Sequence, residues 1–175
     1  MRINYKKILN LRKLASEPKK LFALLIFVLV ILFIQNYMTL NSSFEAKVLR
    51  VIDGDTIEVL YNDERLRIRF FGIDAPELKQ EFGVQAKEAL SKILNSKMVE
   101  ISYKNKDIYG RIVGVVKLKN TDINKLLVAK GFAWADTYYT SVYVNEQIKA
   151  QKNKLGLWQG KNPIEPYKWR KNNKF

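Results

Sequence analysis

Two short acidic segments hold the residues best suited to chemistry. Asp53 and Asp55 flank a glycine in the first segment, and Asp74 and Glu77 enclose an Ala-Pro pair in the second. Proline fixes its own φ and biases the residue before it towards extended backbone, so Asp74 and Glu77 are expected on a stiff bend. If Asp55 and Asp74 converge, their charges repel, and a divalent cation between them relieves that repulsion.

Two arginines stand close to these segments in the sequence. Arg69 closes an alternation of polar and apolar residues that predicts a half-buried strand, and Arg111 ends a turn that contains Asp107 and Tyr109. A cation beside two arginines makes an electropositive pocket, which suits a phosphodiester whose negative charge grows in the transition state. Because the chain contains no histidine, Glu77 is the candidate base for a water molecule.

Each of these features has an ordinary structural explanation when it is taken alone. Asp-Gly is a common hairpin turn, a glutamate is favourable near a helix N-terminus, and strand arginines are usually solvated. The prediction of a cation and a phosphate therefore depends on the combination.

The composition narrows the chemistry. The 175 residues include 31 Lys and Arg against 17 Asp and Glu, with no Cys and no His, and the net charge is +14. These absences exclude a thiol nucleophile, a Cys/His zinc site and a Ser-His-Asp triad, and leave carboxylates and a hard cation such as Ca²⁺ or Mg²⁺. After residue 39 the chain holds 24 basic and 16 acidic residues, so it keeps a charge of +8. This excess favours nucleic acid or an anionic membrane surface as partner, with solubility as the plain alternative.

The N-terminal region has the pattern of a membrane signal. Residues 1–20 are basic, residues 21–34 contain no polar side chain, and residues 35–40 can extend the apolar segment into the membrane interface. We predict a transmembrane signal anchor at 21–40, with 1–20 in the cytoplasm and the remaining chain outside, as a single-pass protein of the cell membrane. A signal peptide that is cleaved to give a secreted protein and a buried helix are the alternatives.

The remaining chain predicts an α+β domain. Residues 44–71 read as a three-stranded meander because turn residues separate three strand-like runs. A helix, two more strands and two further helices follow, and a small five-stranded barrel of oligonucleotide/oligosaccharide-binding (OB) type fits this order. The predicted strands are 44–52, 56–61, 65–71, 97–103 and 111–118, and the predicted helices are 85–95, 123–130 and one that includes 144–155. We place the domain at 41–160 and a basic tail at 161–175, which either packs an aromatic residue or is mobile.

Three motifs in register resemble the thermonuclease (staphylococcal-nuclease-like) family. They are Val-Ile-Asp-Gly-Asp-Thr at 51–56, Arg69 followed by Asp74, Pro76 and Glu77, and Asp107-x-Tyr-Gly-Arg111. The similarity runs from about residue 44 to Trp158. It implies a five-stranded OB-type barrel with three helices, and Ca²⁺-dependent hydrolysis of DNA and RNA.

The resemblance also implies roles for individual residues. Asp55 and Asp74 match the calcium ligands, with Ala75 adding its backbone carbonyl, and Glu77 matches the general base. Arg69 and Arg111 match the arginines on the scissile phosphate, and Asp53 holds the turn that carries Asp55. Tyr109 and Tyr139 are expected to contact the nucleotide.

Single-stranded or frayed DNA and RNA are the expected substrates, because the backbone must reach the site. We expect a monomer that needs no protein partner and meets the membrane through its N-terminal helix. Two other function classes remain open. One is a non-catalytic OB-fold module that binds single strands or a protein, and the other is a membrane anchor with a structural domain attached. A pure binder of polyanions has no need of carboxylates in its binding face, which favours the enzyme.

Overall fold

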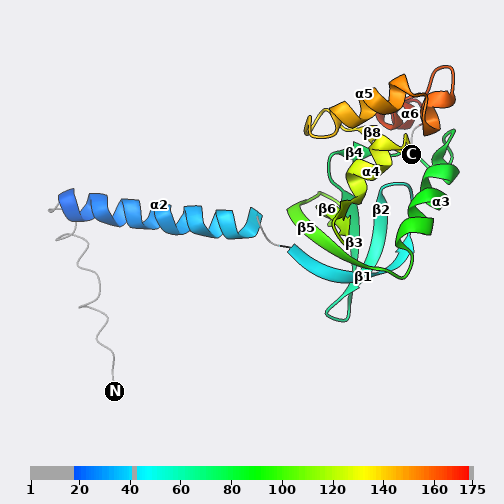
Figure 1. Cartoon of the computed structure of the whole chain (residues 1–175). Helices are drawn as coiled ribbons and strands as arrows, with labels where there is room; N and C mark the ends of the chain where they lie inside the picture. The colour runs from blue at the N-terminus through cyan, green and yellow to red at the C-terminus, as the bar shows by residue number, and fades with distance from the viewer. Residues whose placement is uncertain (1–17, 41–42, 174–175) are drawn as a thin grey trace. The chain divides into compact units, whose positions relative to one another are not determined.

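The computed structural model describes residues 18–40 and 43–173, and the chain divides into two compact units (Figure 1). The first unit ends at Leu40 and contains the N-terminal helix. The second unit begins at Asn41 and contains the sheet and all later helices. The buried core residues all belong to this second unit, so we expect segment 41–175 to fold without the helix.

Helix α2 (Pro18–Leu40) is apolar on every side over most of its length. Its large apolar side chains from Leu21 to Ile34 are exposed within the unit. A helix of 23 residues rises about 34 Å, and the apolar part of a bilayer is about 30 Å thick. The length and composition of α2 therefore fit a membrane helix or, this close to the N-terminus, a signal sequence.

Five strands form the barrel that the sequence predicted. They are β1 (Ser43–Val51), β2 (Thr56–Tyr61), β3 (Glu64–Phe70), β5 (Met98–Lys106) and β6 (Ile112–Leu118). Strand β1 pairs antiparallel with β2 and β5, β2 pairs with β3, and β5 pairs with β6. The barrel closes because β3 and β6 also pair, in parallel, with Arg69 opposite Val113. The predicted fold class is confirmed.

The core follows from the alternation of side chains along the strands. Ala46 and Val48 of β1 and Ile68 and Phe70 of β3 point inwards and are buried, whereas their neighbours are more exposed. Helix α3 (Gly83–Leu94) covers the barrel with one apolar face, formed by Ala86, Leu90 and Leu94. Ala86 also lies against Gly54, so α3 packs on the turn that carries Asp53 and Asp55.

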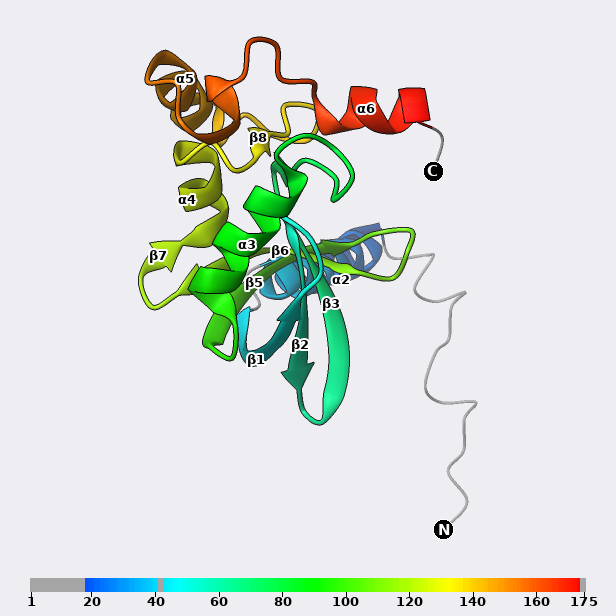
Figure 2. The ribbon, with the colours of Figure 1, turned by 90° about the vertical axis from the view of Figure 1, so that its right-hand side faces the viewer.

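Smaller elements surround the barrel, and Figure 2 shows β8 (Trp134–Ala135) and α6 (Pro166–Asn173) near the loop that leads into α3. Asp74 lies in a short strand that pairs with Trp134 on the opposite strand. Asp122 caps the helix that follows it, because its side chain accepts a hydrogen bond from the Lys125 amide at 2.9 Å. The remaining elements are β4 (Ile73–Asp74), β7 (Thr121–Asp122), α4 (Ile123–Ala129), α5 (Val144–Lys152) and the 3₁₀ turn η2 (Gly156–Gln159).

A buried asparagine ties α4 to the strand ends beside the site. The Asn124 side chain is fully buried, accepts a hydrogen bond from the Val116 amide at 3.0 Å and donates to the Phe71 carbonyl at 2.9 Å. The Phe71 amide in turn donates to the Gly114 carbonyl at 2.8 Å. These bonds satisfy backbone groups that would otherwise be buried without partners, and they fix the chain where β3 leads to Asp74.

Candidate active site

The first acidic segment is a tight turn packed against the second. The Asp53 side chain accepts a hydrogen bond from the Asp55 amide at 3.0 Å, which fixes the turn. A Cβ atom added at Gly54 would lie 2.6 Å from the Cβ of Ala75. Only glycine allows so close an approach, and the approach brings Asp55 to the segment that carries Asp74.

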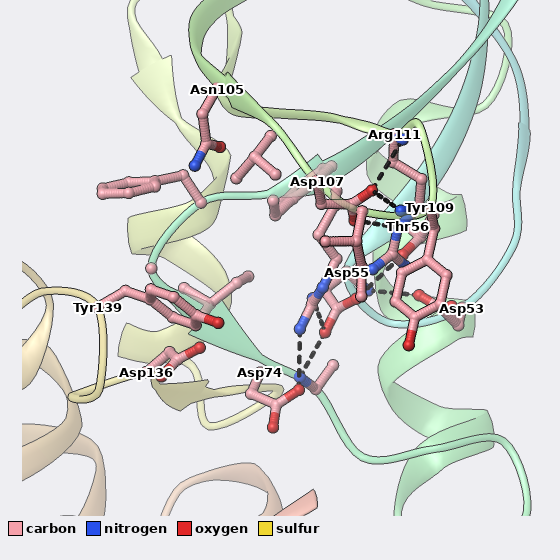
Figure 3. Close-up of a pocket in the computed structure, with 18 of the residues that line it drawn as sticks. Asp53, Asp55, Thr56, Asp74, Asn105, Asp107, Tyr109, Arg111, Asp136 and Tyr139 are labelled. Atoms are coloured by element: carbon pink, nitrogen blue, oxygen red, sulfur yellow. Dashed lines mark hydrogen bonds and ion pairs between the residues drawn. The ribbon is translucent and has the colours of Figure 1, made fainter. Parts of the chain in front are cut away.

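Asp55 and Asp74 converge around one arginine. The Asp55 carboxylate accepts a hydrogen bond from the Ala75 amide at 2.6 Å, and it pairs with Nη1 of Arg69. Nη2 of Arg69 donates to Oδ1 of Asp74 at 2.9 Å. Both aspartates are buried, and the Arg69 side chain is only 17% exposed. The structure thus brings together Arg69 of β3, Asp55 of the turn before β2 and Asp74 of β4. Figure 3 shows the two aspartates close to each other.

The two buried carboxylates need positive charge nearby if they are to stay ionised. Burial raises the pKa of Asp55, and the Arg69 guanidinium opposes that shift. Burial also raises the pKa of Asp74, where the neighbouring Asp55 adds to the rise. Asp136, which the sequence analysis did not single out, lies at the same pocket, and burial followed by the charge of Asp74 raises its pKa as well. Two buried carboxylates side by side are stable as anions only when cations face them.

Glu77 lies at the edge of the pocket, in a loop that is held by hydrogen bonds between Glu77 and Gln80. Its amide donates to the Gln80 side chain at 3.2 Å, and its carbonyl accepts from the Gln80 amide at 2.8 Å. A Cβ atom added at Gly83 would overlap that same carbonyl oxygen, so α3 begins directly against the loop. The Glu77 side chain is 37% exposed, which leaves its carboxylate accessible to water and substrate.

Arg111 is held by Asp107 within its own turn. Asp107 accepts hydrogen bonds from the Arg111 amide at 2.9 Å and from its Nε at 2.7 Å. Burial would raise the pKa of Asp107, but these hydrogen bonds outweigh it and lower the pKa. The guanidinium also lies 5.5 Å from the ring centre of Tyr109. Arg111 lines the same pocket as the acidic cluster, and no ion pair to Asp55 or Asp74 occupies its guanidinium in the described residues.

All the predicted site residues line or adjoin one open pocket of about 720 Å³. Tyr109 and Tyr139 are 78% and 73% exposed, and Figure 3 shows them on opposite sides of the aspartate pair. Exposed aromatic rings at the edge of such a pocket can stack on bases. The predicted residues in the pocket lining are Asp53, Asp55, Arg69, Asp74, Ala75, Glu77, Tyr109, Arg111 and Tyr139.

The structure adds a residue that the sequence analysis missed. Arg170 of α6 reaches the pocket and forms ion pairs with Asp74 and Glu77, each at 2.9 Å. These partners are more than ninety positions away in the sequence. No local pattern in the basic tail marks this arginine among its neighbours.

The donor atoms fit a hard divalent cation. The carboxylates of Asp55 and Asp74 are buried side by side, and the chain has no Cys or His to offer a softer ligand. Within residues 18–40 and 43–173 there is no group of three or more acidic, His or Cys side chains placed to hold a metal. A cation here would therefore complete its coordination with backbone oxygen and water, as Ca²⁺ and Mg²⁺ commonly do.

Comparison with known proteins agrees with this geometry. A family model described as staphylococcal nuclease homologue matches residues 67–160. The micrococcal nuclease of Shigella flexneri is 39% identical over 146 residues, which cover 76% of this chain and 84% of that protein. An uncharacterized endonuclease of Escherichia coli is 36% identical over 144 residues, covering 81% and 94% of the two chains. An uncharacterized endonuclease of Haemophilus influenzae is 38% identical over 132 residues, covering 74% of each chain. The chain therefore belongs to the staphylococcal nuclease family.

Proposed function

We propose that this protein is a calcium-dependent nuclease that hydrolyses phosphodiester bonds of DNA and RNA. The observation that carries the proposal is the buried Asp55–Asp74 pair, set around Arg69 in a pocket that also holds Glu77 and Arg111. Membership of the family and the nuclease names of the relatives support the same reaction.

Asp55 and Asp74 would hold the cation through their carboxylates, and Ala75 would contribute its backbone carbonyl. Ca²⁺ suits this oxygen-only set, and when bound it would supply positive charge for the phosphate. The carboxylates are already ordered by hydrogen bonds from the Ala75 amide and from Arg69. Binding would thus require little rearrangement of the aspartate backbone.

The side chains around the cation site would transfer the proton and stabilise the charge of the transition state. Glu77 accepts the proton of the attacking water, because it is the accessible carboxylate on the rim of the pocket. Arg111 and Arg69 face the charge that develops on the phosphate oxygens. A single hydrogen-bond donor in such a position lowers the barrier by about 3–4 kcal/mol.

The surroundings of the pocket favour a single-stranded or frayed substrate. Tyr109 and Tyr139 offer exposed rings for unpaired bases, and a base inside a duplex cannot reach them. The charge of +8 after residue 39 would add affinity for the backbone that weakens with salt.

The N-terminal helix suggests where this activity resides. Helix α2 would anchor the protein in the cytoplasmic membrane, and the basic residues before it would stay inside. The nuclease unit would then act outside the cytoplasmic membrane, or as a secreted protein if α2 is removed.

The proposal is tested by incubating segment 41–175 with single-stranded DNA in Ca²⁺, in Ca²⁺ with excess chelator, and in Mg²⁺. We expect cleavage in Ca²⁺ and its loss with chelator. DNA binding measured in parallel separates an enzyme from a binding module. Tight, salt-sensitive binding without product under every divalent cation would contradict the nuclease and support the module.

A further inference from the structure

Helix α6 places the guanidinium of Arg170 among the acidic side chains of the site. Nη1 of Arg170 lies 3.1 Å from Oδ1 of Asp74 and 2.9 Å from Oε1 of Glu77, and Nη2 lies 2.9 Å from Oδ2 of Asp74. One guanidinium therefore engages both oxygens of Asp74 and also the candidate base. This is the arrangement in which a planar, forked cation binds carboxylates most strongly.

A second contact places the tail over the same loop. The Gln80 side chain donates to the Ile164 carbonyl at 2.7 Å while its oxygen accepts from the Glu77 amide. Figure 2 shows α6 beside the loop that leads into α3. The segment before α6 and the loop of Glu77 thus share one buried side chain, and α6 is aimed at the pocket.

Helix α6 buries little apolar surface of its own. Of its eight residues only Pro166 is buried, and Tyr167 is largely exposed. Trp169 of the same helix is half-buried, so apolar contact also holds α6, but a competing charge can disrupt the ion pairs of Arg170 with Asp74 and Glu77. By contrast, Arg69 lies in a barrel strand and cannot leave the site without disturbing the barrel.

We propose that Arg170 is a built-in counter-ion, which occupies the acidic site when no divalent cation is bound and must leave when one binds. This inference rests on the proposed function, because it uses the same cation site. A cation on Asp74 and the Arg170 guanidinium would compete for the same two oxygens. The docked tail also pairs with Oε1 of Glu77, so the candidate base carries a counter-ion until α6 leaves. Cation binding and release of α6 are therefore coupled.

The coupling has a measurable size. If α6 is docked about nine-tenths of the time, the apparent affinity for the cation falls about tenfold below that of the open site. Replacing Arg170 should therefore raise the apparent affinity for the cation about tenfold. The release should also expose the backbone of α6 to a protease.

The experiment uses segment 41–175 with Arg170→Ala, with Arg170→Lys and with Lys168→Ala as matched control. Lys168 lies in the same helix and pairs with Glu165 at 3.1 Å. Calorimetry measures the affinity for Ca²⁺, and digestion with a lysine-specific protease that needs no calcium reports cleavage after Lys168 in the variants that keep it.

We expect Arg170→Ala to bind Ca²⁺ about tenfold more tightly than wild type, with Arg170→Lys in between and Lys168→Ala within twofold of wild type. Ca²⁺ should speed cleavage after Lys168 in wild type, whereas Arg170→Ala should be cleaved fast without it. Equal Ca²⁺ affinities, or a tail that stays protected when Ca²⁺ is bound, would overturn the inference and leave the nuclease intact. If neither wild type nor Arg170→Ala binds Ca²⁺ or cleaves DNA, the proposed function fails as well.

Discussion

Replacing Glu77 with Gln should reduce the cleavage rate of single-stranded DNA about 10²- to 10⁴-fold, the range that a general base contributes. The amide has nearly the shape of the carboxylate but cannot accept the proton of the attacking water. The loss should appear in kcat, because the residues that hold the nucleic acid are unchanged.

Glu81→Gln is the matched control for this variant. Glu81 is an exposed glutamate of the same loop, and the same change of charge occurs there outside the pocket of the aspartate pair. Its kcat should stay within twofold of wild type. Equal effects of the two substitutions would show that charge in this loop, rather than proton transfer at Glu77, controls the rate.

The second large effect is expected from Arg69→Met, which leaves two buried carboxylates facing each other. Removing one partner of a buried ion pair destabilises a protein by about 3–5 kcal/mol. The pairs of Arg69 with Asp55 and Asp74 are of this kind. The free energy of unfolding of segment 41–175 in urea measures the loss.

Arg65→Met tests whether this loss belongs to the site. Arg65 lies in the same strand, but its side chain is 74% exposed and its contact with Glu58 is 3.5 Å long. Exposed pairs contribute less than about 1 kcal/mol. The double variant Arg69→Met/Asp55→Asn should recover part of the Arg69 loss, since one unpaired charge is gone. If Arg69→Met costs no more than Arg65→Met, the cluster is not held together by this arginine.

The strands of the barrel could be predicted from the sequence because the pattern that marks a strand is local, whereas the closure of β3 against β6 joins distant segments and was implied by the family resemblance. Alternation of apolar residues marks the strands, and Asp-Gly and Asn-Asp turns separate them. The acidic segments were found for the same reason, since their unusual residues stand next to each other. The predicted ends differ by a few positions: α3 begins at Gly83 rather than at 85, where contact with the Glu77 loop sets the start.

The tail could not be predicted in this way. Helix α6 carries no apolar stripe, and its role depends on Arg170 meeting Asp74 and Glu77 from the far end of the chain. Asn124 was equally hidden, because its burial and its bonds to Phe71 and Val116 appear only once the barrel has closed. Charged and polar residues are usually exposed to solvent, and only the tertiary structure shows which of them are buried.

The central claim is that the Asp55–Asp74 pair is the cation site of a nuclease. The most direct measurement compares wild type with Asp55→Asn and Asp74→Asn in segment 41–175, following Ca²⁺ binding and cleavage of single-stranded DNA in the same samples. The account predicts that both variants stay folded, lose most of their Ca²⁺ affinity and cleave at least about 100-fold more slowly, while they still bind DNA. Cleavage that continues near the wild-type rate in either variant, or that ignores Ca²⁺ in wild type, would contradict it.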